Sequence, residues 1–340
     1  MTETDSVAVL TTKAKQMLGD TGSRLDVELL LGHCLGLTRT ALLARSDQRL
    51  SPTQLTLFKA MLEQRRAGVP LAYLLNRQAF WTSEFKVTAD TLIPRADTEL
   101  LIATILERCT QPDCTLIDLG TGSGAIAVSI AKERPHWTVI GTDQCSRALN
   151  VAQDNGRNLS NLYWVQANWL DGFADARFDI IVANPPYIAP DDAHLPALRY
   201  EPRQALVAAD GGLEDLKTII SQAKGRLTKT GHLLLEHGYN QQSAVNNNQQ
   251  STIHSQQSTD SSQQSTINSQ QSTFNNQQSA VKNRQSTVNN QQSTINNPQS
   301  TINNQQSTTN NQQPTANNQQ STINNQQSTY AGIWHFGYDE

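Results

Sequence analysis

The chain has 340 residues, of which 37% are hydrophobic, and its 26 Lys and Arg against 30 Asp and Glu give a formal net charge of −4. Polar residues are concentrated in the last hundred positions, so residues 1–240 are the part that can bury a core. This part carries 24 basic and 27 acidic side chains. This slight excess of acidic side chains argues against nucleic-acid binding, which needs a basic surface.

The sequence shows neither a membrane-targeting nor a metal-binding pattern. Residues 1–20 lack a basic stretch followed by an apolar core, and no apolar run is long enough to span a bilayer. The four cysteines lack the paired spacing of a metal site, so we expect reduced thiols, no metal and a cytoplasmic protein. They are Cys34, Cys109, Cys114 and Cys145.

Residues 1–75 are predicted to form a small helical domain. Apolar side chains recur at helical spacing in three stretches, Ser51-Pro52 is typical of a helix start, and Gly68-Val69-Pro70 is expected to end the last helix. Residues 76–90 are expected to form a linker that contains a β-hairpin over 80–87. The predicted helical core comprises Val7, Leu10, Ala14, Met17 and Leu18, then Val27, Leu29, Leu30 and Leu31, then Leu55, Phe58, Met61 and Leu62.

Residues 91–240 alternate apolar strands with helices, which predicts a parallel, doubly wound α/β sheet. In such sheets ligands bind beyond the carboxyl ends of the strands. Residues that directly follow a strand are therefore the candidate site residues. The expected strands are 115–119, 138–143, 162–167, 178–183 and 231–236.

A glycine-rich turn follows the first of these strands. Gly120-Thr121-Gly122-Ser123-Gly124 leads into a run of helix formers at 125–133. Glycines permit positive φ angles and close approach of a ligand, and the helix start offers unpaired N–H groups. The pattern predicts a cofactor-binding turn, although a dinucleotide-binding loop would look similar. Asp143, at the end of the second strand, is a candidate to bind ribose hydroxyls.

Two prolines end the apolar run at 178–183, in Asn184-Pro185-Pro186-Tyr187. Because proline cannot donate to a strand ladder, the strand is expected to stop at Asn184. The Asn184 side-chain oxygen and the Pro185 carbonyl could accept both hydrogens of one NH2 group, while the Tyr187 ring could lie against a flat substrate. The motif is also compatible with a simple helix-initiating turn.

Together, the turn at 118–124 and the motif at 184–187 resemble those of the class I S-adenosylmethionine-dependent methyltransferases. Several other segments are similar to the peptide chain release factor N5-glutamine methyltransferase family in particular. The resemblance spans about residues 5–240. It departs from the family pattern at Ala96, Asn76 and Asn168, where proline, glycine and aspartate are usual. The similar segments are Phe80-Trp81, Phe85-Lys86-Val87, Leu92-Ile93-Pro94-Arg95-Ala96-Asp97-Thr98-Glu99, Arg199-Tyr200-Glu201-Pro202, Ala205-Leu206 and Leu233-Leu234-Leu235-Glu236-His237-Gly238.

The resemblance implies that S-adenosyl-L-methionine methylates the side-chain amide (N5) of the glutamine in the Gly-Gly-Gln loop of peptide chain release factors. It implies that the helical domain helps to hold the release factor; we expect a monomer, with no direct nucleic-acid or membrane contact. Asn184, Pro185 and Tyr187 would be catalytic, and Pro186 would join them in binding substrate. The cofactor would contact Gly120, Thr121, Gly122, Ser123, Gly124, Asp143, Asn184 and Trp169, the last beside the adenine.

Three alternatives compete with this interpretation. A glutamine methyltransferase acting on a ribosomal protein would share the 184–187 motif, but the segment 93–99 argues against it. A DNA adenine methyltransferase would grip an exocyclic amine in the same way, but it needs a basic, base-flipping region that the sequence lacks. The chain could also be a non-catalytic remnant, interrupted by the repeat that follows.

Residues 241–329 consist of a seven-residue repeat of Asn, Gln, Ser and Thr. It has at most one apolar position per period, too few for a coiled coil, so we expect disorder, with a β-solenoid or an aggregation-prone stack as the alternative. The repeat begins where the family continues with a helix and a terminal strand hairpin. Of residues 330–340, Ala331–Phe336 could supply one short strand, and without the hairpin the strand at 231–236 would be an exposed apolar edge.

Overall fold

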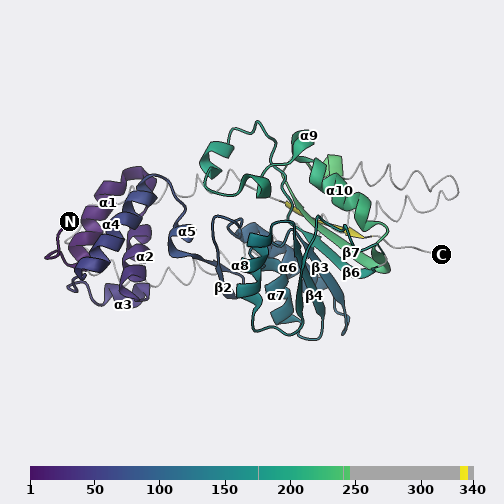
Figure 1. Ribbon diagram of the computed structural model, residues 1–340, viewed down its shortest axis with the longest axis horizontal. Coiled ribbons are helices and arrows are strands. Elements are labelled where there is room, and N and C mark those ends of the chain that lie inside the picture. The colour runs from purple at the N-terminus through teal and green to yellow at the C-terminus, as the bar shows by residue number, and fades with distance from the viewer. Residues whose placement is uncertain (175, 240, 246–329, 336–340) are drawn as a thin grey trace, which may run out of the picture. The chain divides into compact units, whose positions relative to one another are not determined.

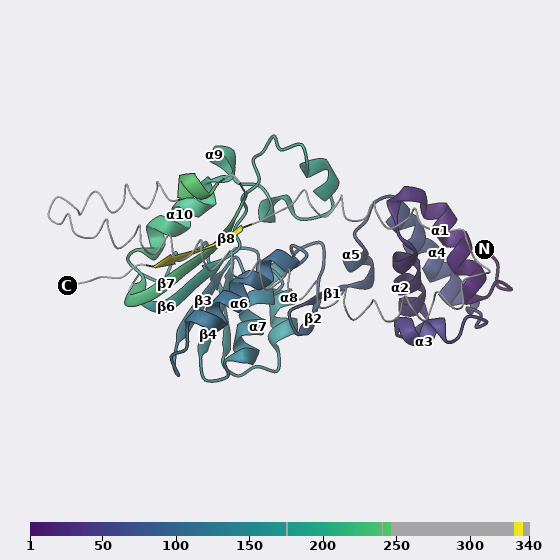
Figure 2. The same ribbon diagram turned by 180° about the vertical axis from the view of Figure 1, so that it is seen from behind.

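The computed structural model describes residues 1–174, 176–239, 241–245 and 330–335, all of which belong to one compact unit (Figure 1). The disorder expected over 241–329 was wrong for residues 241–245, because Gln241 and Val245 are buried and Gln241 donates to the Tyr187 carbonyl at 2.9 Å. The remainder of the repeat, 246–329, lies outside the described residues. The chain begins with helices, continues through a short hairpin, and then builds a six-stranded sheet with helices on both faces (Figures 1 and 2).

Five helices precede the hairpin, and most of their predicted apolar stripes are buried. Met17 is an exception at 44% exposed, because the inner face of the first helix is completed by Thr11 instead. The helix that begins at Ser51-Pro52 ends at Arg66, just before Gly68-Val69-Pro70 as expected, but it is not the last one, because Pro70 caps one more short helix. The five are α1 (Val7–Leu18), α2 (Arg24–Leu35), α3 (Arg39–Leu43), α4 (Pro52–Arg66) and α5 (Leu71–Leu75).

Side-chain caps explain where α4 and α2 begin. At α4 the Ser51 hydroxyl accepts from the Gln54 N–H at 3.3 Å, and the Gln54 side chain accepts from the Ser51 N–H at 2.9 Å, with Pro52 in the first turn. This reciprocal box satisfies two backbone donors that the helix leaves unpaired. At α2 the Ser23 hydroxyl accepts from the Asp26 N–H at 3.1 Å. The sequence signal at 51–52 therefore corresponds to a real start.

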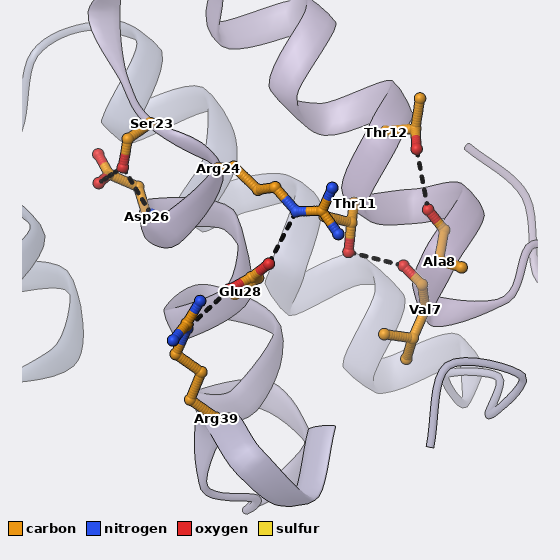
Figure 3. Close-up of polar contacts among 9 residues, drawn as sticks. All are labelled: Val7, Ala8, Thr11, Thr12, Ser23, Arg24, Asp26, Glu28 and Arg39. Atoms are coloured by element: carbon orange, nitrogen blue, oxygen red, sulfur yellow. Dashed lines mark hydrogen bonds and ion pairs between the residues drawn. The ribbon is translucent and has the colours of Figure 1, made fainter. Parts of the chain in front are cut away.

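Glu28 is the one buried carboxylate of the described part of α1–α5, at 2% exposed (Figure 3). Its two oxygens accept from Arg24 Nε at 2.9 Å and from Arg39 Nε at 2.7 Å. Burial alone would raise the pKa of Glu28, but hydrogen bonds and charge from the two guanidinium groups lower it on balance. The carboxylate thus joins the start of α2 to α3.

We expect Glu28→Gln to lower the free energy of unfolding by about 1 to 3 kcal/mol at pH 7, because charge-assisted hydrogen bonds are lost. Because the pKa of Glu28 is lower in the folded state, its ionised form stabilises the fold fully at pH values above the ordinary pKa of 4.5. The difference in free energy of unfolding between the two proteins should therefore disappear as the pH falls below 4.5 and through the lowered pKa. Urea unfolding at several pH values measures this. Glu63→Gln, at an exposed pair with Arg66, is the control and should change stability by less than about 0.5 kcal/mol. Equal effects of the two variants would contradict the account.

The predicted hairpin is confirmed as β1 (Arg77–Phe80) and β2 (Ser83–Lys86). Phe80 and Phe85 pack edge to face, with ring centroids 5.8 Å apart. The side chain of Asn155 fixes the hairpin to the sheet domain, because it accepts from the Lys86 N–H at 2.8 Å and donates to the Lys86 carbonyl at 3.0 Å.

The main sheet has the order β5-β4-β3-β6-β7-β8, with the first five strands parallel. This confirms the predicted doubly wound fold, with two changes of boundary: β5 ends at Gln166, and β7 begins already at Leu227, across an irregular register beside Phe178. The strands are β3 (Thr115–Leu119), β4 (Thr138–Asp143), β5 (Leu162–Gln166), β6 (Phe178–Ala183), β7 (Leu227–His237) and β8 (Tyr330–His335).

Alternate residues of the central strands face opposite layers of helices, which is why the strand sequences are almost continuously apolar. Leu116 and Val182 pack with α6 (Glu99–Arg108) and α7 (Ala125–Glu133). Ile117 and Ile181 pack instead with α10 (Glu214–Ala223). α8 (Ser146–Gly156) lies beside α7, and the short α9 (Ala209–Gly212) precedes α10 (Figure 1).

The strand β8 pairs antiparallel with β7, from Tyr330 opposite His237 to His335 opposite His232 (Figure 2). One short strand from the C-terminal residues was expected and is found. The expectation of an exposed edge at 231–236 was wrong, because β8 covers it. The chain therefore leaves β7 and returns beside the same end of it.

We expect the free energy of unfolding of a chain that stops before Tyr330 to be at least about 2 kcal/mol lower than that of the full chain, because six residue pairs with β7 are lost. Stopping after His335 keeps β8 and is the matched control. Thermal and urea unfolding of the three chains measures the effect. If the two truncated chains are equally stable, β8 does not protect the edge of β7.

Candidate active site

A cleft of about 980 Å³, open to solvent, lies at the carboxyl ends of β3 and β6, where the sheet order reverses. Two of the predicted motifs meet there although they are far apart in sequence. Its walls include Thr98, Gly120, Asp143, Trp169, Asn184 and Asp215.

The glycine-rich turn leaves β3 in a conformation that only glycine adopts easily. Gly120 and Gly122 have φ angles of 68° and 56°, and Gly124 starts α7 with a φ of 80°. Asp118, buried in the sheet, accepts from the Thr121 hydroxyl at 2.6 Å and from the Ala127 N–H at 3.2 Å. Burial raises the pKa of Asp118 to about 7, although these hydrogen bonds lower it. The carboxyl group thus fixes the turn to the first turn of α7.

Trp169 packs directly on this turn. A Cβ built on Gly120 would lie 3.1 Å from the Trp169 ring, a tight contact that would push the ring back by a few tenths of an ångström. Trp169 itself has a φ of 49°, and its indole donates a hydrogen bond to Asp215. Burial raises the pKa of Asp215, and the indole hydrogen bond lowers it. The indole is therefore held as a flat apolar wall of the cleft.

Asp143 lies at the end of β4, on the same cleft. Its carboxylate accepts from the Gly122 N–H at 3.0 Å and from the Cys145 N–H at 2.8 Å. Burial raises its pKa, and the two backbone hydrogen bonds lower it. The acid predicted to bind ribose thus stands beside the glycine turn, oriented by backbone donors.

Asn184 follows β6 and lines the cleft together with Pro186. Its Nδ2 donates to the Thr98 hydroxyl at 3.1 Å. Pro185 is buried. Tyr187 lies deeper, with its ring against the apolar cluster under α10 and its hydroxyl donating to Glu236 at 3.3 Å. The structure therefore brings Asn184 and Pro186 to the cleft wall, and it turns Tyr187 toward the core.

Three residues at this site were not predicted, namely Thr98, Asp215 and Glu236. An acid directly after the apolar run 233–235 was a usable signal for Glu236, because an unpaired charge is rarely buried. Thr98 and Asp215 carried no such signal.

The described residues contain no group of three or more potential metal ligands. Among the helices that the structure describes, none has the length and hydrophobicity to cross a membrane. Burial raises the pKa of Cys34 and Cys109 to about 11, and that of Cys114 to about 12, so these thiols stay protonated at neutral pH.

Comparisons with known proteins find a matching domain for both the helical part and the sheet part of the chain. Residues 10–75 match the model of the PrmC N-terminal domain, and residues 95–201 match that of the methyltransferase small domain. A solved structure of ribosomal protein L11 methylase from Lactobacillus delbrueckii subsp. bulgaricus is similar at a TM-score of 0.35 and 22% identity, over 45% of this chain and 67% of that one. That likeness is too remote to bear on function.

Curated relatives are much closer. The release factor glutamine methyltransferase of Escherichia coli strain K12 is 42% identical over 234 residues, which cover 68% of this chain and 84% of that protein. Its counterpart from Coxiella burnetii is 42% identical over 225 residues, covering 65% and 81%, and that from Vibrio cholerae is 41% identical over 239 residues, covering 69% and 84%. With identity of this degree over both matched domains, the chain belongs to the release factor glutamine methyltransferase family.

Proposed function

We propose that this chain transfers a methyl group from S-adenosyl-L-methionine to the side-chain amide nitrogen of the glutamine in the Gly-Gly-Gln loop of a peptide chain release factor. The observation that carries the proposal is that the glycine turn after β3 and the Asn184 amide line a single cleft. Relatives named release factor glutamine methyltransferase, 42% identical to this chain, support the choice of substrate.

The cleft residues fit the cofactor. Gly120 lets the turn lie close beneath Trp169, where a Cβ would make a tight contact at 3.1 Å, and the flat Trp169 ring suits adenine. Asp143 presents a carboxylate oriented for ribose hydroxyls, and the turn Gly120–Gly124 offers backbone donors at the start of α7. We assign cofactor binding to this turn, Asp143, Trp169 and Asn184.

The chemistry places its main demand on the substrate nitrogen. S-adenosylmethionine supplies a methyl group activated by a positively charged sulfur. An amide nitrogen is a poor nucleophile, because its lone pair is delocalised into the carbonyl group. Asn184 Oδ1 and the Pro185 carbonyl would accept the two amide hydrogens, favour a less planar nitrogen and fix its direction. Positioning of this kind can lower a barrier by about 7 kcal/mol.

We assign holding of the release factor to the helical domain 1–75, methyl transfer to 91–240, and the connection between them to 76–90. Pro186 would contact the substrate side chain from the loop after β6, whereas Tyr187, which packs on the apolar cluster under α10, would support that loop from behind. We further propose that the enzyme acts as a monomer in the cytoplasm, where release factors work, without binding nucleic acid itself.

We expect Asn184→Ala to lower kcat/KM by about 100-fold or more, because one fixed acceptor at the reacting amide is lost. The measurement is transfer of a radiolabelled methyl group to purified release factor, with an unchanged midpoint of thermal unfolding as the control for folding. A release factor whose loop glutamine is replaced should take up no label. Transfer by Asn184→Ala at the full rate, or label on a release factor that lacks the loop glutamine, would contradict the assignment.

The cofactor assignment is tested at Gly120. We expect Gly120→Ala to weaken cofactor binding at least about 10-fold, because the new methyl group would press on Trp169 and a side chain strains the positive φ. Gly172→Ala is the matched control, since Gly172 also has a positive φ but its Cβ would contact nothing within 4 Å. Equilibrium titration with S-adenosylhomocysteine measures both. Equal losses would mean that backbone strain, and not the contact with Trp169, is responsible.

The same measurements separate the alternatives. A chain that binds cofactor but does not methylate release factor would have another substrate, such as a ribosomal protein. A chain that binds no cofactor would be a non-catalytic remnant.

A further inference from the structure

Glu236 is a buried carboxylate beside the cleft that the mechanism above does not use. It lies near the end of β7, next to β6, and is 1% exposed. Its oxygens accept from the Thr98 hydroxyl at 2.7 Å and from the Tyr187 hydroxyl at 3.3 Å, and the Asn184 side chain is a third hydrogen-bond partner. One carboxylate therefore gathers polar side chains from the segment before α6 and from the loop after β6.

The protons in this cluster decide which way the Asn184 amide faces. The Thr98 hydroxyl gives its single proton to Glu236, so its oxygen can only accept from Asn184 Nδ2, at 3.1 Å. An ionised carboxylate also only accepts, and hydrogen bonding from the Asn184 side chain lowers the pKa of Glu236, so the NH2 end of the amide is the end that Glu236 favours. The amide NH2 group is thus directed toward Thr98 and Glu236.

The Asn184 oxygen is left for a ligand in the cleft that Asn184 lines. If the amide were turned over, its oxygen would face two acceptors and its NH2 group would face the substrate. That arrangement would repel a glutamine NH2 group, because donor would meet donor. The reaction needs the first orientation.

We propose that Glu236 is a positioning residue, which acts with Thr98 to hold the Asn184 amide with its oxygen toward the substrate nitrogen. The inference rests on the proposed function, because only a substrate with amide hydrogens needs this orientation. Glu236 belongs to β7 and is not one of the residues that line the cofactor cleft. Its effect should therefore fall on the rate of transfer and not on cofactor binding.

The orientation depends on the charge of Glu236. Burial raises the pKa of Glu236 to about 7, hydrogen bonds from Thr98, Tyr187 and Asn184 lower it, and the charge of Asp97, from the segment before α6, raises it. Burial and Glu236 together raise the pKa of Tyr187, which stays a hydroxyl donor. A protonated Glu236 would donate a hydrogen itself and free the Thr98 proton. The orientation of Asn184 is then no longer fixed, so kcat should rise with pH through about 7.

The test compares kcat, KM and cofactor affinity for the full chain and three variants, Glu236→Gln, Thr98→Val and Thr98→Ser. We expect Glu236→Gln and Thr98→Val to lower kcat about 100-fold at unchanged KM for release factor and unchanged affinity for S-adenosylhomocysteine. Thr98→Ser keeps the hydroxyl and should recover most of the rate lost in Thr98→Val. The rise of kcat near pH 7 should vanish in Glu236→Gln; if it persists there, it belongs to another group such as Asp118.

A second measurement does not depend on activity. The NMR signals of the Asn184 side-chain NH2 group, identified as those that Asn184→Asp removes, should shift with a midpoint near pH 7 in the full chain and not in Glu236→Gln. The proposal would be overturned if Glu236→Gln transfers methyl groups at the full rate. It would also be overturned if the Asn184 NH2 signals shift with pH in the same way in the full chain and in Glu236→Gln. Absence of transfer by the unchanged chain would instead refute the proposed function, and the NMR result would still decide whether Glu236 holds Asn184.

Discussion

The site depends on one feature of the sheet, the parallel pairing of β3 with β6. In that register Leu119 stands beside Ala183, so the residues that follow them, Gly120 and Asn184, begin at the same edge of the sheet. The glycine turn must leave β3 with positive φ angles, and the two prolines must end β6. Gly120 and Asn184, to which we assign the cofactor and the substrate amide, become neighbours because the two strands stop at the same level.

The polar groups around this edge are unusual for a protein interior. Asp118 and Glu236 are buried carboxyl groups whose pKa values burial raises to about 7. At pH values between the ordinary pKa of these acids and about 7, the folded state keeps protons that the unfolded state releases. These two groups therefore lower the free energy of unfolding as the pH rises. Glu28 behaves in the opposite way, because its two arginines lower its pKa. The destabilising acids lie where the turn and the Asn184 amide must be held, which is where such a cost is expected in an enzyme.

Patterns local in sequence predicted most of the fold and pointed to several of the residues that line the cleft. A few neighbouring residues are enough to predict each of these features: the apolar strands, the glycine turn, the position of Asp143 after its strand, and the strand end at Pro185-Pro186. The contacts of Glu236 could not be found in this way, because Thr98 is 138 positions away and only the sheet order brings it near. The pairing of β8 with β7 was missed for the same reason, since its two strands are separated by the whole repeat. The direction of the Tyr187 ring is likewise decided by the apolar layer under α10, which the motif itself does not encode.

The central claim is that the cleft directs a methyl group to one nitrogen of one glutamine. Tandem mass spectrometry of release factor treated with the full chain and S-adenosylmethionine tests it most directly. The account predicts a mass gain of one CH2 on the glutamine of the Gly-Gly-Gln loop, with methylamine released on acid hydrolysis because the group sits on the amide nitrogen. A methyl group on any other residue, or one that is released as methanol from an ester, would contradict it.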